Sequence, residues 1–248
     1  MRLSRKEHIA DNFGAAAPRY EEAALLQKQV AANLSKHLPA LEGGADILEI
    51  GCGTGLMTRY LLRRYPRAHL HVTDISPSML AAARENITSA SVKWGILDGE
   101  NPPANLPAYD LIISSMVFQW FEDIDGALEK LGKHLKPTGA ILFALPGPHS
   151  GAQWQSILQE LGYPSGLLEF TAPPGIIAEE IIKRPYAGAH AFLTHMKDLG
   201  AHEPKASYRP LNPGHLRTAM RRFDRQGYKD VDWHILYGAL KKEEIIKA

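Results

Sequence analysis

The sequence predicts an α/β fold built on a doubly wound sheet. From residue 45 onward, short apolar segments of strand type alternate with amphipathic segments of helical period, which is the pattern of a parallel sheet covered on both faces. A glycine-rich turn, LEIGCGTG at 48–55, joins the first strand to the first helix, and the next two strands each lead into an aspartate. These features would meet at the carboxyl edge of the sheet, where such folds bind ligands.

Composition and charge narrow the classes of function. The 248 residues are 45% hydrophobic, which suffices for one sizeable core. The 28 Lys and Arg residues balance 27 Asp and Glu, so the net charge of +1 gives no global attraction to nucleic acid. A single cysteine, Cys52, cannot form an intrachain disulfide, and neither a signal peptide nor an apolar run of about 20 residues is apparent. We expect a cytoplasmic protein without membrane or nucleic-acid partners.

The core elements follow from the change of period along the chain. Strands are expected at 46–50, 70–74, 91–96, 110–116 and 140–145, and helices at about 55–65, 77–87 and 123–135. Two helices precede this core and are expected to be interrupted at Pro18 and stopped at Pro39. After it come a helical insertion, a helix that stops at Gly227 and a last strand at 230–242. The blocks of this single expected domain are 1–40, 41–150, 151–210 and 211–248.

The turn at 48–55 predicts a nucleotide-like ligand. A glycine-rich passage from strand to helix lets the backbone approach a ligand and presents unpaired N–H groups at the positive end of the helix. Gly51, Gly53 and Gly55 follow the pattern G-x-G-x-G, whereas dinucleotide binding requires G-x-G-x-x-G. The spacing argues against NAD. By itself the motif is weak, because a structural turn without a ligand looks the same.

Two aspartates strengthen this prediction. Asp74 ends the second strand, where a carboxylate can accept both hydroxyls of a ribose. Asp98 follows the third strand, where it could take an adenine amino group. Each has an alternative: Asp74 as a helix cap, although Ser76 and Pro77 make a good cap without it, and Asp98 as a turn residue. The common sheet edge makes the three features together favour a nucleotide-like ligand.

These motifs, with YDLIISSMVFQW at 109–120, resemble those of the class I S-adenosylmethionine-dependent methyltransferases over about residues 40 to 145. The resemblance implies a Rossmann-like sheet of seven strands with the last antiparallel, and S-adenosyl-L-methionine as cofactor. Asp74 would be the ribose acid, and Asp98 and Gly99 would lie beside the adenine. The residues expected at the cofactor are Glu49, Gly51, Gly53, Gly55, Asp74, Ile75, Met79, Asp98, Gly99, Ser114 and Tyr20.

Segments outside the nucleotide fold carry a narrower resemblance. NFGAAAPRYEEAALLQ (12–27), SSMVFQW (114–120) and MKDLGAHEP (196–204) are similar to the malonyl-acyl-carrier-protein O-methyltransferases of biotin synthesis. This implies methyl transfer to the free carboxylate of a malonyl thioester on acyl carrier protein, or on CoA, with the helices of 1–40 as a lid. The stretch 165–190 looks shorter than in the family, without a clear sixth strand.

The implied chemistry requires few groups from the protein. By analogy with side-chain carboxylates of pKa about 4, a malonyl half-acid is ionised at neutral pH and needs no general base. We therefore expect no catalytic residue in the strict sense, only placement and exclusion of water. The 11 histidines include no i, i+4 pair backed by carboxylates, so we expect no metal.

Substrate and docking residues are predicted from position and charge. Gln119 and Trp120 follow the fourth strand and could wall the transfer site, although Trp120 could equally be core, as Tyr20 could be a half-buried helix aromatic. An arginine fork suits the malonyl carboxylate, and Arg209 is preferred to Arg184. A basic stripe on the helix at 215–226 would suit an acidic carrier protein, although such stripes are commonly solvated faces. Its members are Arg217, Arg221 and Arg225.

Two other functions use the same cofactor site. One is a methyltransferase of a small carboxylic acid or a natural-product hydroxyl, with a different lid. The other is a module that binds the cofactor without catalysing a reaction. Selective loss of a carrier-protein substrate on reversal of Arg217 and Arg221 would exclude the first, and turnover with any acceptor would exclude the second.

Overall fold

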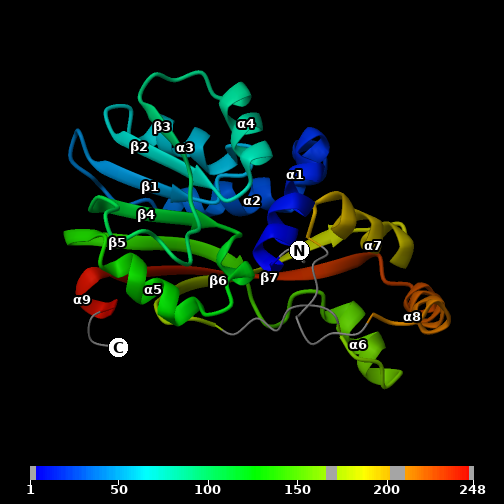
Figure 1. Ribbon diagram of the computed structural model, residues 1–248. Coiled ribbons are helices and arrows are strands. Elements are labelled where there is room, and N and C mark those ends of the chain that lie inside the picture. The colour runs from blue at the N-terminus through cyan, green and yellow to red at the C-terminus, as the bar shows by residue number, and fades with distance from the viewer. Residues whose placement is uncertain (1–3, 166–171, 202–209, 246–248) are drawn as a thin grey trace.

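A seven-stranded mixed sheet forms the centre of the molecule (Figure 1). The computed structural model describes residues 4–165, 172–201 and 210–245. The strand order is β3-β2-β1-β4-β5-β7-β6, and β7 runs antiparallel to both of its neighbours. The predicted α/β fold with an antiparallel last strand is confirmed. The strands are β1 (Asp46–Ile50), β2 (His69–Asp74), β3 (Val92–Ile96), β4 (Tyr109–Ser115), β5 (Leu135–Pro146), β6 (Ile176–Pro185) and β7 (Asp230–Lys241).

Different helices cover the two faces of the sheet. Successive side chains of a strand point to opposite faces, so Leu111 and Ile113 of β4 join one buried cluster and Ile112 joins the other. The first cluster includes side chains of α2 (Leu25–Leu34), α3 (Leu56–Arg64) and α4 (Pro77–Asn86). The second includes α5 (Ile124–Gly132) and α9 (Lys242–Ile245). Burial on both faces explains why these strands are almost continuously apolar.

The N-terminal helices break later than the sequence predicts. Helix α1 (Arg5–Ala23) runs through Pro18, and the interruption falls at Ala24, which separates it from α2. A proline inside a helix removes one backbone hydrogen bond, but α1 begins with a capping box from Ser4 and Glu7 and packs against α4 and α7 (Ala189–Asp198). These interactions keep the helix intact. A short 3₁₀ turn, η1 (Ser35–His37), ends the second helix just before Pro39, near the predicted stop.

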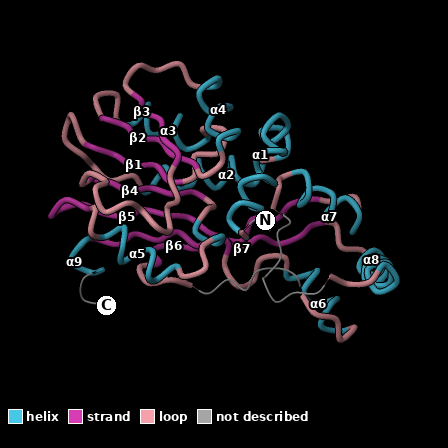
Figure 2. Tube along the Cα trace, in the orientation of Figure 1, coloured by secondary structure: helices cyan, strands magenta, loops and turns pink. Residues whose placement is uncertain are grey.

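The expectation of a purely helical insertion at 151–210 is wrong. Helices α6 (Ala152–Glu160) and α7 are present, but β6 lies between them and pairs along its length with β7 (Figure 2). The missing sixth strand of the sequence analysis is therefore present. Its sequence, IIAEEIIKRP, has apolar residues in adjacent pairs, which mimic helical spacing, and only the long pairing with β7 establishes its alternation. Helix α8 (Pro213–Gln226) ends at Gly227 as predicted.

Candidate functional site

A cavity lies at the carboxyl ends of β1, β2 and β4, beneath α1. The space between its lining side chains, including the part open to solvent, amounts to about 960 Å³. The three elements of the sequence prediction, which are the glycine turn, Asp74 and Asp98, all reach it. The predicted residues that line the cavity are Tyr20, Glu49, Gly51, Gly53, Asp74, Ile75, Met79, Asp98, Gly99 and Trp120.

Asp74 joins the end of β2 to the glycine turn. The backbone N–H of Gly53 donates to Asp74 Oδ2 and that of Ser76 donates to Oδ1, each at 2.8 Å. An ionised carboxylate has about four acceptor positions, so two remain for a ligand in the cavity. Burial raises the pKa of Asp74 to about 6, although these backbone donors act in the opposite direction. The arrangement suits a pair of neighbouring hydroxyls.

Glu49 is a second buried carboxylate at this edge. It is 2% exposed at the end of β1, and Oε2 accepts a hydrogen bond of 2.7 Å from Thr58 of α3. Burial raises its pKa to about 7; the Thr58 hydroxyl opposes the shift and the charge of Asp74 adds to it. Two buried acids in one cavity favour a ligand that carries positive charge.

Asp98 is held by a lysine that the sequence analysis did not identify. Lys6 Nζ of α1 lies 2.6 Å from Asp98 Oδ2 and 2.7 Å from Glu100 Oε2, and it lines the cavity. Asn101 Nδ2 donates to Asp98 Oδ2 and the Glu100 N–H donates to Oδ1. Burial alone would raise the pKa of Asp98, but the bonds from Lys6 and Asn101 outweigh it and lower the pKa. Oδ1 retains room for one further donor.

Helix α1 covers the cavity with one face. Ile9, Phe13 and Tyr20 line it from above, at spacings that fall on one side of a helix. Phe13 packs edge-on against Trp120, with ring centroids 5.4 Å apart, and against Tyr20 at 6.4 Å. Arg5 Nη1 donates to the carbonyl oxygen of Trp120 at 3.1 Å. The helix is thus attached to the loops after β3 and β4.

Three predicted residues do not line the cavity. Gly55, with φ +90°, precedes α3, and a Cβ there would lie 2.5 Å from Ile87 Cδ1. Ser114 is 1% exposed and donates to the Ile50 carbonyl oxygen at 3.1 Å. Gln119 donates to the Met116 carbonyl oxygen at 2.7 Å. These residues shape the loops around the cavity, and their contact with a ligand stays a prediction.

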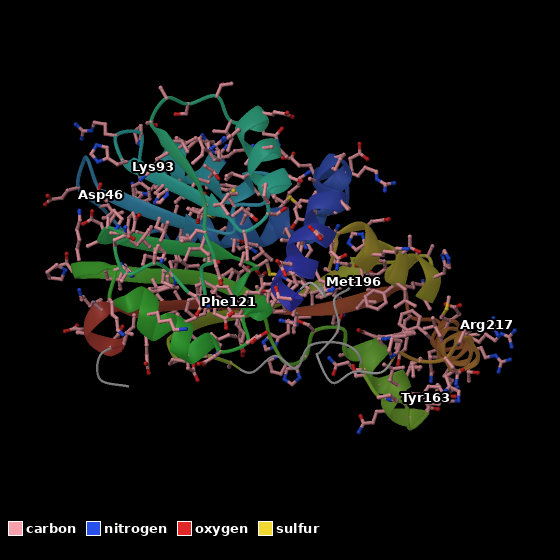
Figure 3. All side chains as sticks on the ribbon, viewed as in Figure 1. Asp46, Lys93, Phe121, Tyr163, Met196 and Arg217 are labelled. Atoms are coloured by element: carbon pink, nitrogen blue, oxygen red, sulfur yellow. The ribbon has the colours of Figure 1, made fainter. Side chains whose placement is uncertain are left out.

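The predicted arginines that the structure describes do not line the cavity. Arg209 is outside the described residues, and Arg184 is half-buried on β6 without lining the cavity. Figure 3 shows Phe121, a lining residue, near the middle of the view and Arg217 at the outer edge on α8. The three stripe arginines are exposed, whereas Arg222 pairs with Glu160 at 2.6 Å.

Sequence reasoning missed several lining residues. Ile9 and Phe13 are among them, and their spacing with Tyr20 along one face of a helix is a usable signal in the sequence. Lys6 gave none, because its acidic partners lie more than 90 residues away. Gln27 lines the cavity from α2, and its Oε1 is buried without a hydrogen-bond partner. Such an acceptor becomes visible only when the fold is known.

Comparison with known proteins decides the family. A methyltransferase domain family matches residues 48–141. The malonyl-[acyl-carrier protein] O-methyltransferase of Magnetococcus marinus is 31% identical over 95% of this chain and 92% of its own length. The chain belongs to the malonyl-[acyl-carrier protein] O-methyltransferase family. The biotin biosynthesis bifunctional protein BioCD of Bordetella avium is 37% identical over 94% of this chain, which spans 52% of that protein.

Solved structures agree on the fold of this O-methyltransferase family member. A phosphoethanolamine N-methyltransferase of Haemonchus contortus in complex with S-adenosyl-L-methionine superimposes with a TM-score of 0.57 at 16% identity, over 96% of this chain and 60% of the other. A putative methyltransferase of Haloferax volcanii, in complex with its Trm112 activator, gives 0.56 at 19% identity over 93% and 97%. At these identities, the two likenesses show only that this chain has the same fold.

S-adenosylmethionine is the cofactor of this O-methyltransferase, and the cavity fits it. The free acceptor positions of Asp74 match two ribose hydroxyls, and the buried Glu49 and the unpaired Gln27 Oε1 match a ligand that carries ammonium and sulfonium groups. Within the described residues, no group of three or more His, Cys, Asp and Glu side chains is placed to hold a metal ion. Nor does any described helix have the length and apolar character needed to span a bilayer.

Proposed function

We propose that the protein methylates the free carboxylate of a malonyl thioester carried by acyl carrier protein, in biotin synthesis. The observation that carries the proposal is the 31% identity with a malonyl-[acyl-carrier protein] O-methyltransferase over 95% of this chain and 92% of the relative. The chain is an S-adenosylmethionine-dependent O-methyltransferase. The identity of the acyl carrier is the proposed part.

The proposed reaction needs orientation more than proton transfer. S-adenosylmethionine supplies an electrophilic methyl group, and a malonyl carboxylate is ionised at neutral pH because carboxylic acids have pKa values of about 4. Asp74, Glu49 and Asp98 would hold the cofactor, and the side chains of α1 would exclude water. Alignment of methyl group and carboxylate can contribute roughly 7–11 kcal/mol to the lowering of the barrier.

The apolar end of the cavity is the proposed acceptor side. Phe13, Trp120 and Phe121 line it, and the loop after β4 brings Met116 to the same cavity. Among the described lining residues, Lys6 is the only Lys or Arg, and its ammonium is already shared by Asp98 and Glu100. The acceptor carboxylate would therefore be oriented mainly by aromatic walls and by the positive charge of the sulfonium. Arg209 stays a prediction for a direct contact.

Mass spectrometry of malonyl-acyl carrier protein, incubated with the protein and S-adenosylmethionine, tests the proposal. The expected result is the gain of one methyl group, which an esterase removes. Malonyl-CoA and free malonate serve as parallel acceptors. An unchanged carrier protein together with a methylated free acid would contradict the proposed acceptor and support the small-acid alternative.

A further inference from the structure

Met116 occupies a strained backbone position beside the cavity. Its φ is +60°, and it is the one residue other than glycine with positive φ among residues 4–165, 172–201 and 210–245. A side chain in this left-handed region carries a steric cost, so the surrounding structure must hold the conformation in place. Met116 follows the last residue of β4 and lines the cavity. Strain at this point affects the shape of the site directly.

Gln119 closes the turn that contains Met116. Its Nε2 donates to the Met116 carbonyl oxygen at 2.7 Å, while the Met116 N–H donates to Ala144 of β5 at 2.7 Å. Both backbone polar groups of Met116, its N–H and its carbonyl oxygen, are thus hydrogen-bonded. The Gln119 Oε1 is buried without a partner. An unpaired buried acceptor is unfavourable, so any favourable contribution of this side chain comes from its donor group.

The same turn presses Val117 against the glycine turn. A Cβ added to Gly51, whose φ is +68°, would lie 2.4 Å from Val117 Cγ2. The valine therefore fills the space that any larger residue at 51 would need. Both Gly51 and Val117 line the cavity. A change in the turn after β4 must be transmitted to the backbone that faces the cofactor.

We propose that Gln119 is a positioning residue of the cofactor site. Its amide fixes the left-handed Met116, this conformation places Val117 on Gly51, and the contact holds the glycine turn in its binding conformation. The inference rests on binding of S-adenosylmethionine in this cavity and not on the identity of the acceptor, which is the proposed part of the function. It also gives Gln119 a role without contact to the substrate.

Titration calorimetry with S-adenosylhomocysteine tests the proposal. Gln119→Met keeps the length of the side chain and removes the donor, and we expect the Kd to rise about tenfold. The thermal unfolding midpoint of the ligand-free protein should change little, since the substitution removes one unpaired acceptor, Gln119 Oε1, and leaves another, the Met116 carbonyl oxygen. Gln226→Met, at the exposed end of α8, is the matched control and should bind as the parent protein does.

A comparison of two backgrounds separates backbone strain from other effects. Glycine adopts positive φ without strain and alanine does not, while both remove the Met116 side chain. In the Met116→Gly background, Gln119→Met should change the Kd by less than about threefold, whereas in Met116→Ala the full effect of about tenfold should remain. Equal responses in the two backgrounds, or an unchanged Kd in Gln119→Met alone, would overturn the proposal.

A replacement variant and a separate activity measurement complete the test. If Gln119→Met does not fold, Gln119→Asn replaces it, because the shorter amide cannot reach the Met116 carbonyl oxygen. No acceptor takes part in the calorimetry. A protein that binds S-adenosylhomocysteine but leaves malonyl-acyl carrier protein unchanged would refute the proposed acceptor and leave the role of Gln119 to be decided by the Kd values.

Discussion

Asp74 serves two purposes in the site. Its two oxygens each accept a backbone N–H, one from the glycine turn and one from Ser76, the residue before α4, so the carboxylate connects two segments. Asp74 also lines the cavity. A single side chain therefore shapes the binding loop and offers the groups that a ribose would engage.

Asp74→Asn should weaken binding of S-adenosylhomocysteine by at least about 100-fold. Whichever way the amide turns, its NH₂ group meets one backbone N–H, so one charge-assisted hydrogen bond is lost and the other becomes a weaker neutral one. Calorimetry gives the affinity directly. The control is Asp125→Asn, in the exposed first turn of α5, and should have little effect. An affinity close to that of the parent protein would exclude Asp74 as a principal binding group.

Binding should also weaken as the pH falls. The pKa of Asp74 is about 6 and that of Glu49 is about 7 in the ligand-free protein, both raised by burial. A cationic ligand with ribose hydroxyls favours the ionised forms, so complex formation releases protons, and the affinity should fall about tenfold or more between pH 7.5 and 5.5.

The stability of the ligand-free protein should follow the opposite trend for these two groups. Because their folded-state pKa values are raised, their contribution to the free energy of unfolding is fully present below the unfolded values and is lost as the pH rises through about 6 to 7. Calorimetry and thermal unfolding over this pH range measure both trends. Affinity that stays constant from pH 7.5 to 5.5 would contradict the assignment.

Among single residues, the sequence identifies those whose roles follow from their place at the end of a strand. Gly51, Asp74 and Asp98 lie at strand ends that any parallel sheet brings to one edge, so their convergence follows from the pattern alone. Lys6 and the left-handed Met116 do not have this property. The position of Lys6 depends on where α1 packs, and the conformation of Met116 depends on bonds from Gln119 and β5, neither of which leaves a local signal.

At the scale of elements, α1 is the part of the molecule that closes the cavity. Its aromatic residues meet Trp120, and its first turn is bound to the loops after β3 and β4 through Arg5 and Lys6. Because Lys6 neutralises a buried acid, Glu100, which is 5% exposed, loss of this lysine leaves an uncompensated charge. The attachment of the helix thus depends on a few polar contacts.

Lys6→Met should loosen α1 and weaken cofactor binding about three- to tenfold, while the fold is retained. Hydrogen–deuterium exchange should increase in residues 5–20, and calorimetry with S-adenosylhomocysteine measures the affinity. Lys133→Met, an exposed lysine at the end of α5, provides the control. Unchanged exchange in α1 would show that the ion pairs with Asp98 and Glu100 do not hold the helix.

The strands were predicted best where both faces of the sheet are buried. Strands β1 and β4 carry buried apolar residues on both faces and stand out in the sequence. Strand β6 lies at the sheet edge, with Ile177 and Ile181 exposed, so its composition does not reveal which face is buried. The break assigned to Pro18 failed for a related reason, since tertiary packing of α1 outweighs the local preference of one residue.

At the scale of the whole molecule, the net charge is only +1, but basic side chains are gathered on one surface. Arg217, Arg221 and Arg225 are exposed on α8, and α7 packs against both α8 and α1. One helix, α7, therefore separates the arginine stripe on α8 from α1, which covers the cavity. An acidic carrier protein seated there would be brought near the cavity by long-range attraction, which acts chiefly on the rate of association.

Arg217→Glu combined with Arg221→Glu should raise the KM for malonyl-acyl carrier protein about five- to tenfold and leave the KM for malonyl-CoA unchanged. The control is Arg63→Glu with Arg67→Glu, which alters the net charge equally at exposed positions near the end of α3. Steady-state methylation at several salt concentrations measures both. Equal loss in the two double variants, or no loss in either, would remove α8 from the docking surface.

The position of β7 between β5 and β6 has a consequence for the order of events during synthesis. A ribosome produces residues 46–146, with β1 to β5, well before residues 230–241, and those early strands can pair with one another as they emerge. Strand β6 has no partner until β7 arrives and inserts beside β5. Until then β6 and one edge of β5 stay unpaired, and nascent chains stalled between residues 185 and 230 should therefore associate with chaperones.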